Sequence, residues 1–220
     1  MIGINQGEHI ILYSRGAIGG MMFSSKVAWL LKSYGHSSDK ISLLNGGLEQ
    51  WVRQGNELSK EEVKLPIGNW KASDYLAKYN IKFEDMEYKD GDKAYLERTD
   101  EINFLDARVR EQFEGMEETG LDPYRVKGSN IPGFKNTPVV DLVHENGELK
   151  TFEEIRQWFA ENGYKPNHPV VTICNTGMQA AMLAQIMEIV LPETSPRVYN
   201  GSMKEMELRD PKRISGGKAY

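Results

Sequence analysis

The feature that most constrains the fold is an internal repeat, in which one order of segments occurs twice. In residues 169–206 a short apolar run, Val170 to Ile173, is followed by a glycine turn, a long apolar run and a second short apolar run. Residues 9–54 follow the same order. Each copy therefore predicts a strand–turn–helix–strand–turn–helix unit. Such units build parallel sheets through right-handed crossovers, so an α/β fold is expected.

The two copies align residue by residue at their second turns. Asn45-Gly46-Gly47 falls opposite Asn200-Gly201-Ser202, which places Ser14 opposite Cys174. Copy two extends far upstream of its cysteine, whereas few residues precede Ser14. A buried parallel strand needs neighbours on both sides, so the first copy is predicted to be incomplete. The expected domains are a partial first domain at 1–57, a linker at 58–100 and a full second domain at 101–220.

Hydrophobic periodicity and turn signals place the individual elements. The predicted strands are 9–13, 40–44, 102–106, 170–173 and 197–199, with a further strand at 70–75. The predicted helices are 21–34, 48–54, 94–99, 178–191 and one from 203. Thr151-Phe-Glu-Glu154 is a capping box for a helix to Ala160. Residues 89–93 are expected to be a turn, and 126–138 a loop.

Composition excludes several classes of partner. The formal charge is −5 and no lysines and arginines cluster, which argues against nucleic acid and anionic membrane surfaces. No apolar run is long enough to span a membrane. A single cysteine excludes an internal disulfide and is typical of a reducing compartment. The first residues match neither a signal peptide nor a presequence, so a cytoplasmic location is expected, or a mitochondrial one for a longer form.

Cys174, the only cysteine, lies where the strand 170–173 ends and a helix begins. Backbone N–H groups of the turn, which contains Gly177, can converge on its sulfur there. Such a cradle favours an anion. The alternative is a buried and inert cysteine, which is common for a lone one.

Several motifs together resemble the rhodanese-like sulfurtransferases, in the two-domain form of thiosulfate and 3-mercaptopyruvate sulfurtransferases. These motifs are Tyr34-Gly-His36, Leu43-Leu-Asn-Gly-Gly-Leu-Glu-Gln-Trp51, Phe104-Leu-Asp-Ala-Arg108, Gly128-Ser-Asn-Ile-Pro-Gly133, Cys174-Asn-Thr-Gly-Met-Gln179 and Val198-Tyr-Asn-Gly-Ser202. The resemblance implies tandem α/β rhodanese domains, each a parallel sheet with helices on both faces. The first copy would be incomplete, and catalysis would belong to the second.

The resemblance also implies a sulfur relay without a cofactor. The Cys174 thiolate would take a sulfane sulfur from thiosulfate or 3-mercaptopyruvate as a persulfide, and a thiol or cyanide would remove it. Asn175, Thr176, Gly177, Met178 and Gln179 would hold the anionic sulfur, with Arg108 and Gln112 beside the substrate. The Thr176 hydroxyl either assists proton transfer or is a plain helix-start residue.

The chain departs from the family at its expected anion contacts. Gln112 stands where the family has an arginine, and Leu121 stands at a second arginine position. For Arg108, a structural ion pair with Asp106 is favoured over a contact with the substrate. Arg110 or Arg125 is a candidate replacement. Two family tryptophans are replaced, by Met203 and Met206.

These departures leave a second interpretation open, a catalytically weak or inactive rhodanese-like binding or regulatory module. A cysteine-dependent phosphatase needs an arginine where Ala180 stands, so that interpretation is disfavoured. The four scattered histidines, His9, His36, His144 and His168, predict no metal site. No oligomeric state is predicted.

Overall fold

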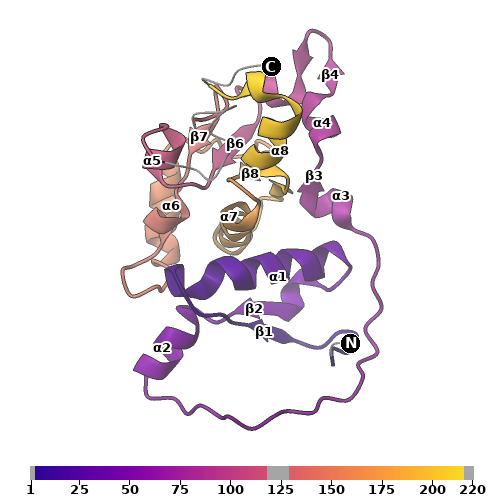
Figure 1. Ribbon diagram of the computed structural model, residues 1–220, viewed down its shortest axis with the longest axis vertical. Helices are drawn as coiled ribbons and strands as arrows, with labels where there is room; N and C mark the ends of the chain where they lie inside the picture. Colours follow the sequence, from indigo (N-terminus) through magenta and orange to yellow (C-terminus); the bar gives the residue numbers. More distant parts are fainter. Residues whose placement is uncertain (1–2, 118–128, 216–220) are drawn as a thin grey trace. The chain divides into compact units, whose positions relative to one another are not determined.

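The computed structural model describes residues 3–117 and 129–215 and divides into two compact units (Figure 1). Unit 1 is Met1–Tyr79 with Val143–Leu149, and unit 2 is Asn80–Leu142 with Lys150–Tyr220. Residues 80–100, which the sequence assigns to a linker, supply strands and a helix of unit 2. The compact units therefore divide the chain at different residues from the predicted domains.

Unit 1 is a small α/β unit built on two parallel strands. Strand β1 (Ile10–Leu12) pairs with β2 (Ile41–Leu43), and helix α1 (Met21–Ser33) connects them. Helix α2 (Gly47–Arg53) follows β2, and α3 (Leu76–Tyr79) ends the segment. Its core joins Ala28 and Leu31 of α1 to Ile41. The 3-10 turns are η1 (Ile18–Gly20) and η2 (Ser38–Lys40).

A distant loop completes unit 1. Residues 143–149 turn back on themselves through a Val143–Leu149 bridge. The Leu149 N–H donates to Asn45 Oδ1 at 2.8 Å. Gly147 lies so close to Gly19 that a Cβ on Gly147 would meet the Gly19 nitrogen at 2.8 Å. Sequence periodicity gives no sign of this contact, because nothing local to the loop requires it.

Unit 2 contains a five-stranded parallel sheet in the order β3-β9-β8-β6-β7. Its strands are β3 (Asn80–Ile81), β6 (Asn103–Asp106), β7 (Lys135–Asn136), β8 (Val170–Ile173) and β9 (Arg197–Tyr199). Its helices are α4 (Phe83–Glu87), α5 (Arg110–Phe113), α6 (Phe152–Glu161), α7 (Met178–Val190) and α8 (Ser202–Arg209). The 3-10 turns are η3 (Tyr95–Glu97), η4 (Val139–Leu142) and η5 (Pro211–Arg213), and β4 (Lys89–Asp90) with β5 (Lys93–Ala94) forms a separate hairpin.

Helices cover both faces of this sheet, as predicted. Alternate residues of a strand point to opposite faces. Val171 and Ile173 of β8 share a core with Met86 of α4 and with the α8 methionines. On the other face Thr172 Oγ1 donates to the Ala180 carbonyl of α7 at 2.9 Å. All four residues of β8 are buried, as expected of a central parallel strand.

The two copies of the repeat show the same backbone clamp. The Leu48 N–H donates to the Ser14 carbonyl at 2.9 Å in unit 1, and the Met203 N–H donates to the Cys174 carbonyl at 3.0 Å in unit 2. The alignment that places Ser14 opposite Cys174 is thereby confirmed. The first copy has a two-stranded sheet and the second a five-stranded one, so the predicted incompleteness of the first copy is also confirmed.

Several local predictions are wrong. Residues 70–75 form no strand, because the Trp70, Ser73 and Tyr75 N–H groups donate to scattered carbonyls of Ile4, Tyr34 and Ser33. The turn predicted at 89–93 is present at residues 91 and 92, but the short strands β4 and β5 flank it, and the predicted loop at 126–138 contains β7. Helix 94–99 is reduced to η3. Gly128 of the predicted loop lies outside the described residues.

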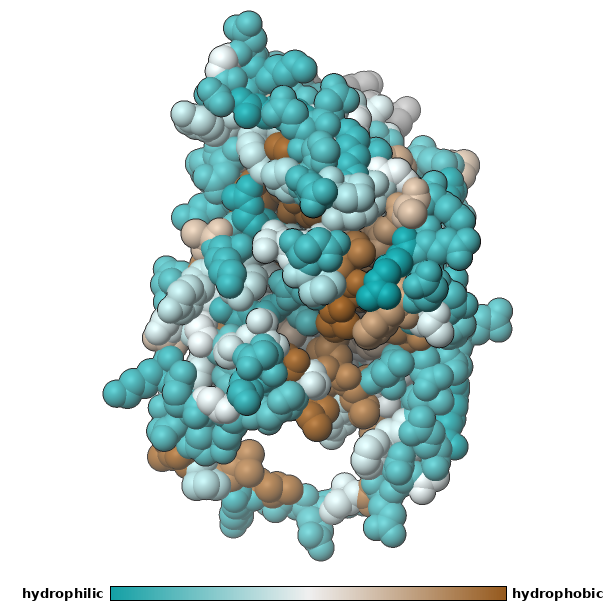
Figure 2. Space-filling view, turned by 180° about the vertical axis from the view of Figure 1, so that it is seen from behind, coloured by the Kyte–Doolittle hydropathy of each residue, from teal (hydrophilic) through white to brown (hydrophobic). Residues whose placement is uncertain are grey.

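The exposed surface is mostly hydrophilic on the face shown in Figure 2, with apolar side chains gathered in places. Among the described residues no helix is both long and apolar enough to cross a membrane. Unit 1 carries exposed apolar side chains on β1, α1 and the segment after α2, including Ile11, Phe23, Val63, Leu65 and Ile67.

Candidate active site

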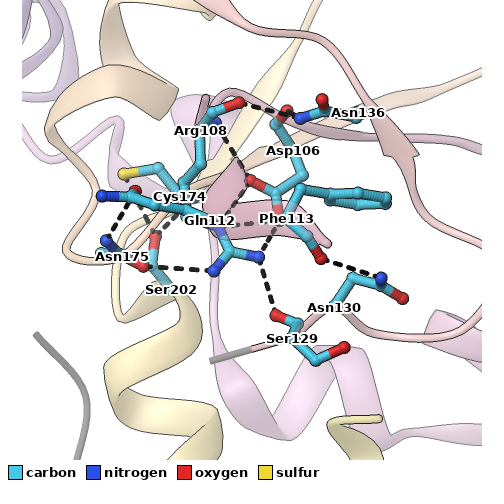
Figure 3. A network of polar contacts seen from close by, with 10 residues as sticks. All are labelled: Asp106, Arg108, Gln112, Phe113, Ser129, Asn130, Asn136, Cys174, Asn175 and Ser202. Atoms are coloured by element: carbon cyan, nitrogen blue, oxygen red, sulfur yellow. Dashed lines mark hydrogen bonds and ion pairs between the residues drawn. The ribbon is translucent and has the colours of Figure 1, made fainter. Parts of the chain in front are cut away.

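Cys174 lies in a tight turn at the carboxyl end of the central strand (Figure 3). Strand β8 ends at Ile173 and α7 begins at Met178, so four residues separate the two elements. Cys174 is a free thiol and only 1% exposed. In an open parallel sheet the carboxyl ends of the strands are where ligands usually bind. The position therefore fits a functional cysteine.

The Gly177 backbone amide points at the sulfur. Its N–H donates to Cys174 Sγ at 3.1 Å. Gly177 has φ +79°, a left-handed conformation that only glycine adopts without strain. A Cβ there would also meet the carbonyl oxygen and Oδ1 of Asn200, both at 2.6 Å. Glycine is required here to bring the amide to the sulfur.

Ser202, at the start of α8, holds the backbone of Cys174. The Cys174 N–H donates to Ser202 Oγ at 3.2 Å, and that hydroxyl donates to the Tyr199 carbonyl at 2.8 Å. Ser202 Oγ is also 4.0 Å from Cys174 Sγ. Ser202 is fully buried with φ +55°, an uncommon conformation for a residue with a side chain.

Sequence reasoning did not include Ser202 among the site residues. The repeat alignment could have indicated that Ser202 is unusual, because it places Ser202 opposite a glycine, Gly47. Both residues have a positive φ, +60° at Gly47 and +55° at Ser202. A second backbone bond, from the Lys204 N–H to the Asn175 carbonyl at 3.0 Å, also fixes the turn to α8.

Arg108 makes a buried ion pair and does not line an open surface. Its Nε donates to Asp106 Oδ1 at 2.9 Å and its Nη2 to Asp106 Oδ2 at 2.6 Å. Nη2 also donates to the Ser129 carbonyl at 3.0 Å. The side chain is 0% exposed. Arg108 therefore forms the ion pair with Asp106 that the sequence favoured over a substrate contact, and its guanidinium is also bound to the loop at 129.

Asn175 links the cysteine turn to two neighbouring elements. Its Oδ1 accepts a hydrogen bond from Arg108 Nη1 at 3.4 Å, and its Nδ2 donates to Gln112 Oε1 at 3.3 Å. The structure thus brings four predicted site residues, Cys174, Asn175, Arg108 and Gln112, into one network (Figure 3). Its buried charges are paired and hydrogen-bonded, as burial requires.

The other predicted residues form the outer part of the turn. Thr176 is exposed, and Met178 and Gln179 are half-buried. Arg110 is exposed on the same short helix as Gln112. Leu121 and Arg125 lie outside the described residues.

Two asparagines that the sequence did not single out support the network. Asn136 Nδ2 donates to the Arg108 carbonyl at 2.8 Å and to the Asp106 carbonyl at 3.2 Å. Asn130 Nδ2 donates to the Phe113 carbonyl at 3.0 Å. Within residues 3–117 and 129–215 no group of three or more potential metal ligands comes together.

Comparison with known proteins supports the motif resemblance. A family model described as a rhodanese-like domain matches residues 92–208, more than half of the chain. This chain belongs to the rhodanese-like domain family. The rhodanese-like match includes β6, β8 and β9, the cysteine turn and nearly all of α8.

Rhodanese-like relatives extend the similarity to nearly the whole chain. It is 56% identical over 220 residues to a Caenorhabditis elegans protein named "Putative thiosulfate sulfurtransferase mpst-1", covering 99% of this chain and 66% of that one. It is 29% identical to the 3-mercaptopyruvate sulfurtransferase of Escherichia coli K12, covering 94% and 68%. The crystal structure of SseA from Escherichia coli, described as a 3-mercaptopyruvate sulfotransferase, superposes with a TM-score of 0.72 at 28% identity, covering 91% and 68%.

The chain spans about two thirds of the length of the rhodanese-like relatives it matches. The family assignment and the tandem α/β fold with parallel sheets are thus established.

Proposed function

We propose that this chain is a sulfurtransferase in which Cys174 carries sulfur as a persulfide. The observation that carries the proposal is the Gly177 N–H at 3.1 Å from the Cys174 sulfur, in a turn at the end of the central strand. Family membership and the sulfurtransferase names of the relatives support it. In this proposal residues 101–220 are the catalytic domain and 1–57 a partial, non-catalytic one.

The chemistry is a two-step covalent transfer. The Cys174 thiolate attacks the outer sulfur of thiosulfate, an S–S bond forms to Cys174, and sulfite leaves with the electron pair of the broken S–S bond. With 3-mercaptopyruvate the broken bond is C–S, and pyruvate leaves after its enolate is protonated. An acceptor thiolate or cyanide then attacks the terminal sulfur and releases the Cys174 thiolate.

The turn supplies electrostatic stabilisation. A preorganised amide aimed at an atom that becomes anionic lowers the energy of that state without any reorganisation. The Gly177 N–H is such a donor, and Ser202 and the α8 amides fix the turn that carries it. The ion pair of Arg108 and Asp106 holds Asn175 from the other side.

Activity with small anionic donors is expected to be weak. Of the two side chains that contact Asn175, the Arg108 guanidinium is already paired with Asp106 and Gln112 is neutral. Bidentate hydrogen bonds from a charged donor bind carboxylates and sulfonates more strongly than hydrogen bonds from a neutral amide do. Cys174 is also almost fully buried, so a donor reaches the sulfur only when side chains around the turn move.

The direct test is a transfer assay that compares the wild-type protein with Cys174→Ser. Each is supplied with thiosulfate or 3-mercaptopyruvate, with cyanide as the acceptor, and thiocyanate is measured. We expect slow release above background from the wild type and none from Cys174→Ser. Equal background from both proteins with both donors would overturn the proposal.

A second candidate, a non-catalytic rhodanese-like binding module, is favoured by two of the same observations. These are the burial of Cys174 and the glutamine at position 112. This candidate predicts a folded protein that accepts no sulfur from either donor.

A further inference from the structure

The position of α5 matters for the cysteine turn. Asn175, the residue after Cys174, donates from Nδ2 to Gln112 Oε1 on this helix at 3.3 Å. Helix α5 has only four residues, and none of them is buried. A helix of this length gains little stability from its own hydrogen bonds, so contacts with the rest of the fold must position it. Whatever holds α5 therefore also maintains its contact with the cysteine turn.

Asn130 holds the end of α5. The last carbonyls of a helix have no partner within the helix, and Asn130 Nδ2 donates to the carbonyl of Phe113, the last residue of α5, at 3.0 Å (Figure 3). The neighbouring Ser129 carbonyl accepts a hydrogen bond from Arg108 Nη2 at 3.0 Å. Arg108 Nη1 donates to Asn175 Oδ1 at 3.4 Å. Ser129 and Asn130 thus support both of the elements that contact the Asn175 side chain.

Asn130 is itself held by the residues that follow α8. The Ser215 N–H donates to the Asn130 carbonyl at 2.8 Å. Ile214, which is almost fully buried, shares the core of unit 2 with Ile131. The backbone of Asn130 is therefore fixed by a hydrogen bond and by the packing of the next residue.

Arg213 of η5 anchors this segment. Its Nη2 and Nε donate to the two carboxylate oxygens of Glu87 at 2.6 and 3.0 Å, and its Nη1 donates to Glu97. Bidentate pairs of this kind are among the strong hydrogen bonds of proteins. They attach η5 to α4 and η3, so the hold on Asn130 begins at these two elements.

We propose that Asn130 is a positioning residue for the Cys174 reaction proposed above. Held by Ser215, it fixes α5 so that Gln112 restrains Asn175 and, with it, the cysteine turn. The role in catalysis rests on the proposed sulfur transfer. The restraint of the turn does not, and it can be measured on the thiol alone.

Alkylation by iodoacetamide measures this restraint. Cys174 is the only cysteine of the chain, so intact-protein mass spectrometry follows a single site. The residue is 1% exposed and should react only when the structure around it opens. A weaker restraint should therefore give faster alkylation. Rates are compared far below the urea midpoint of each variant, where the proteins are folded.

Two substitutions remove the Asn130 hydrogen bond. Asn130→Ala should raise the alkylation rate about fivefold, as expected for the loss of one hydrogen bond. Asn130→Asp keeps the shape of the side chain but removes the donor, so it should raise the rate at least as much. Asn162→Ala is the matched control, because Asn162 Nδ2 donates to the Trp158 carbonyl near the end of α6 at 2.8 Å. It should leave the rate unchanged.

A double-mutant cycle shows whether Asn130 acts through Gln112. Gln112→Ala removes the contact with Asn175 and should also raise the alkylation rate about fivefold. If Asn130 works by holding Gln112 in place, the double variant should alkylate at about the rate of either single variant. Two independent structural effects would instead multiply to about twenty-five-fold.

Arg213→Gln tests the anchor of the segment. It should raise the alkylation rate, whereas Arg98→Gln should not. The two side chains are 21% and 22% exposed, and Arg98 also has two acidic partners, Asp90 and Glu101.

Four results would overturn the positioning role. They are a wild-type rate in Asn130→Ala or Asn130→Asp, an equal rise in Asn162→Ala, a multiplicative double variant, and a wild-type rate in Arg213→Gln. If the rates follow the expected order but the wild type takes no sulfur from thiosulfate or 3-mercaptopyruvate, the sulfur-transfer proposal fails and the restraint by Asn130 stands.

Discussion

Gly177 combines two constraints at a single residue. Its φ of +79° disfavours any side chain, and a Cβ would meet Asn200 at 2.6 Å. Gly177→Ala should therefore displace the amide from the Cys174 sulfur. We expect sulfur transfer to fall at least about tenfold, and stability to fall by about 1–3 kcal/mol, as measured by thiocyanate release and urea unfolding.

Gly91 provides the matched control for this change. It has φ +73°, it lies in the turn of the β4–β5 hairpin, and a Cβ there would meet nothing within 4 Å. Gly91→Ala should cost similar backbone strain and leave transfer at the wild-type rate. An equal loss of transfer in both variants would mean that general destabilisation, and not the amide, is responsible.

Gln112 is the residue whose replacement tests substrate charge. Gln112→Arg adds a second cation next to Asn175, where Arg108 is already paired with Asp106, so the KM for thiosulfate should fall about tenfold. Gln157→Arg makes the same change at an exposed position of α6 and should leave KM unaltered. An unchanged KM in Gln112→Arg would show that donor anions do not bind beside α5.

At the scale of elements, the start of α8 is held by Ser202. Ser202→Ala leaves the buried Cys174 N–H without its acceptor, which typically costs about 1–3 kcal/mol. Ser202→Gly loses the same bond but relieves the positive φ, so it should be the more stable of the two by about 1 kcal/mol. Urea unfolding of both variants measures this. Stabilities equal to that of the wild type would contradict the role given to the hydroxyl.

Elements with a strong local pattern could be predicted from the sequence. Strand β8 is a short run of β-branched residues, helix α7 is a long apolar run, and α6 begins at the capping box of Thr151 and Glu154. Strands β3, β4, β5 and β7 have two residues each, too few for any periodicity. Their positions depend on partners distant in the sequence, such as Val198 and Tyr199 for β3.

The candidate site also has a part that could be predicted from the sequence and a part that could not. The Cys174 turn was predictable because a strand, a glycine and a helix follow one another locally. The burial of Arg108, and the roles of Ser202, Asn130 and Asn136, arise from contacts across the fold. The repeat alignment and the motif that ends at Ser202 both included this residue, but neither gave it a role.

At the scale of the whole molecule, the contacts described for Cys174 all lie within unit 2. Residues 56–67 are exposed and contain no helix or strand. Trypsin should therefore cut first after Lys60 or Lys64. Since unit 2 stays intact, the nicked protein should keep its sulfur-transfer rate, as followed by gel electrophoresis and thiocyanate release.

The variant with both lysines changed to glutamine should resist this cut. A rate that falls in step with cleavage would show that Cys174 depends on the intact segment.

The proposed sulfur transfer requires that Cys174 becomes a persulfide. Intact-protein mass spectrometry after exposure to thiosulfate or 3-mercaptopyruvate tests this most directly. We predict that part of the wild-type protein gains the mass of one sulfur atom, that cyanide removes this gain, and that Cys174→Ser never shows it. A wild-type mass that stays unchanged with both donors would contradict it.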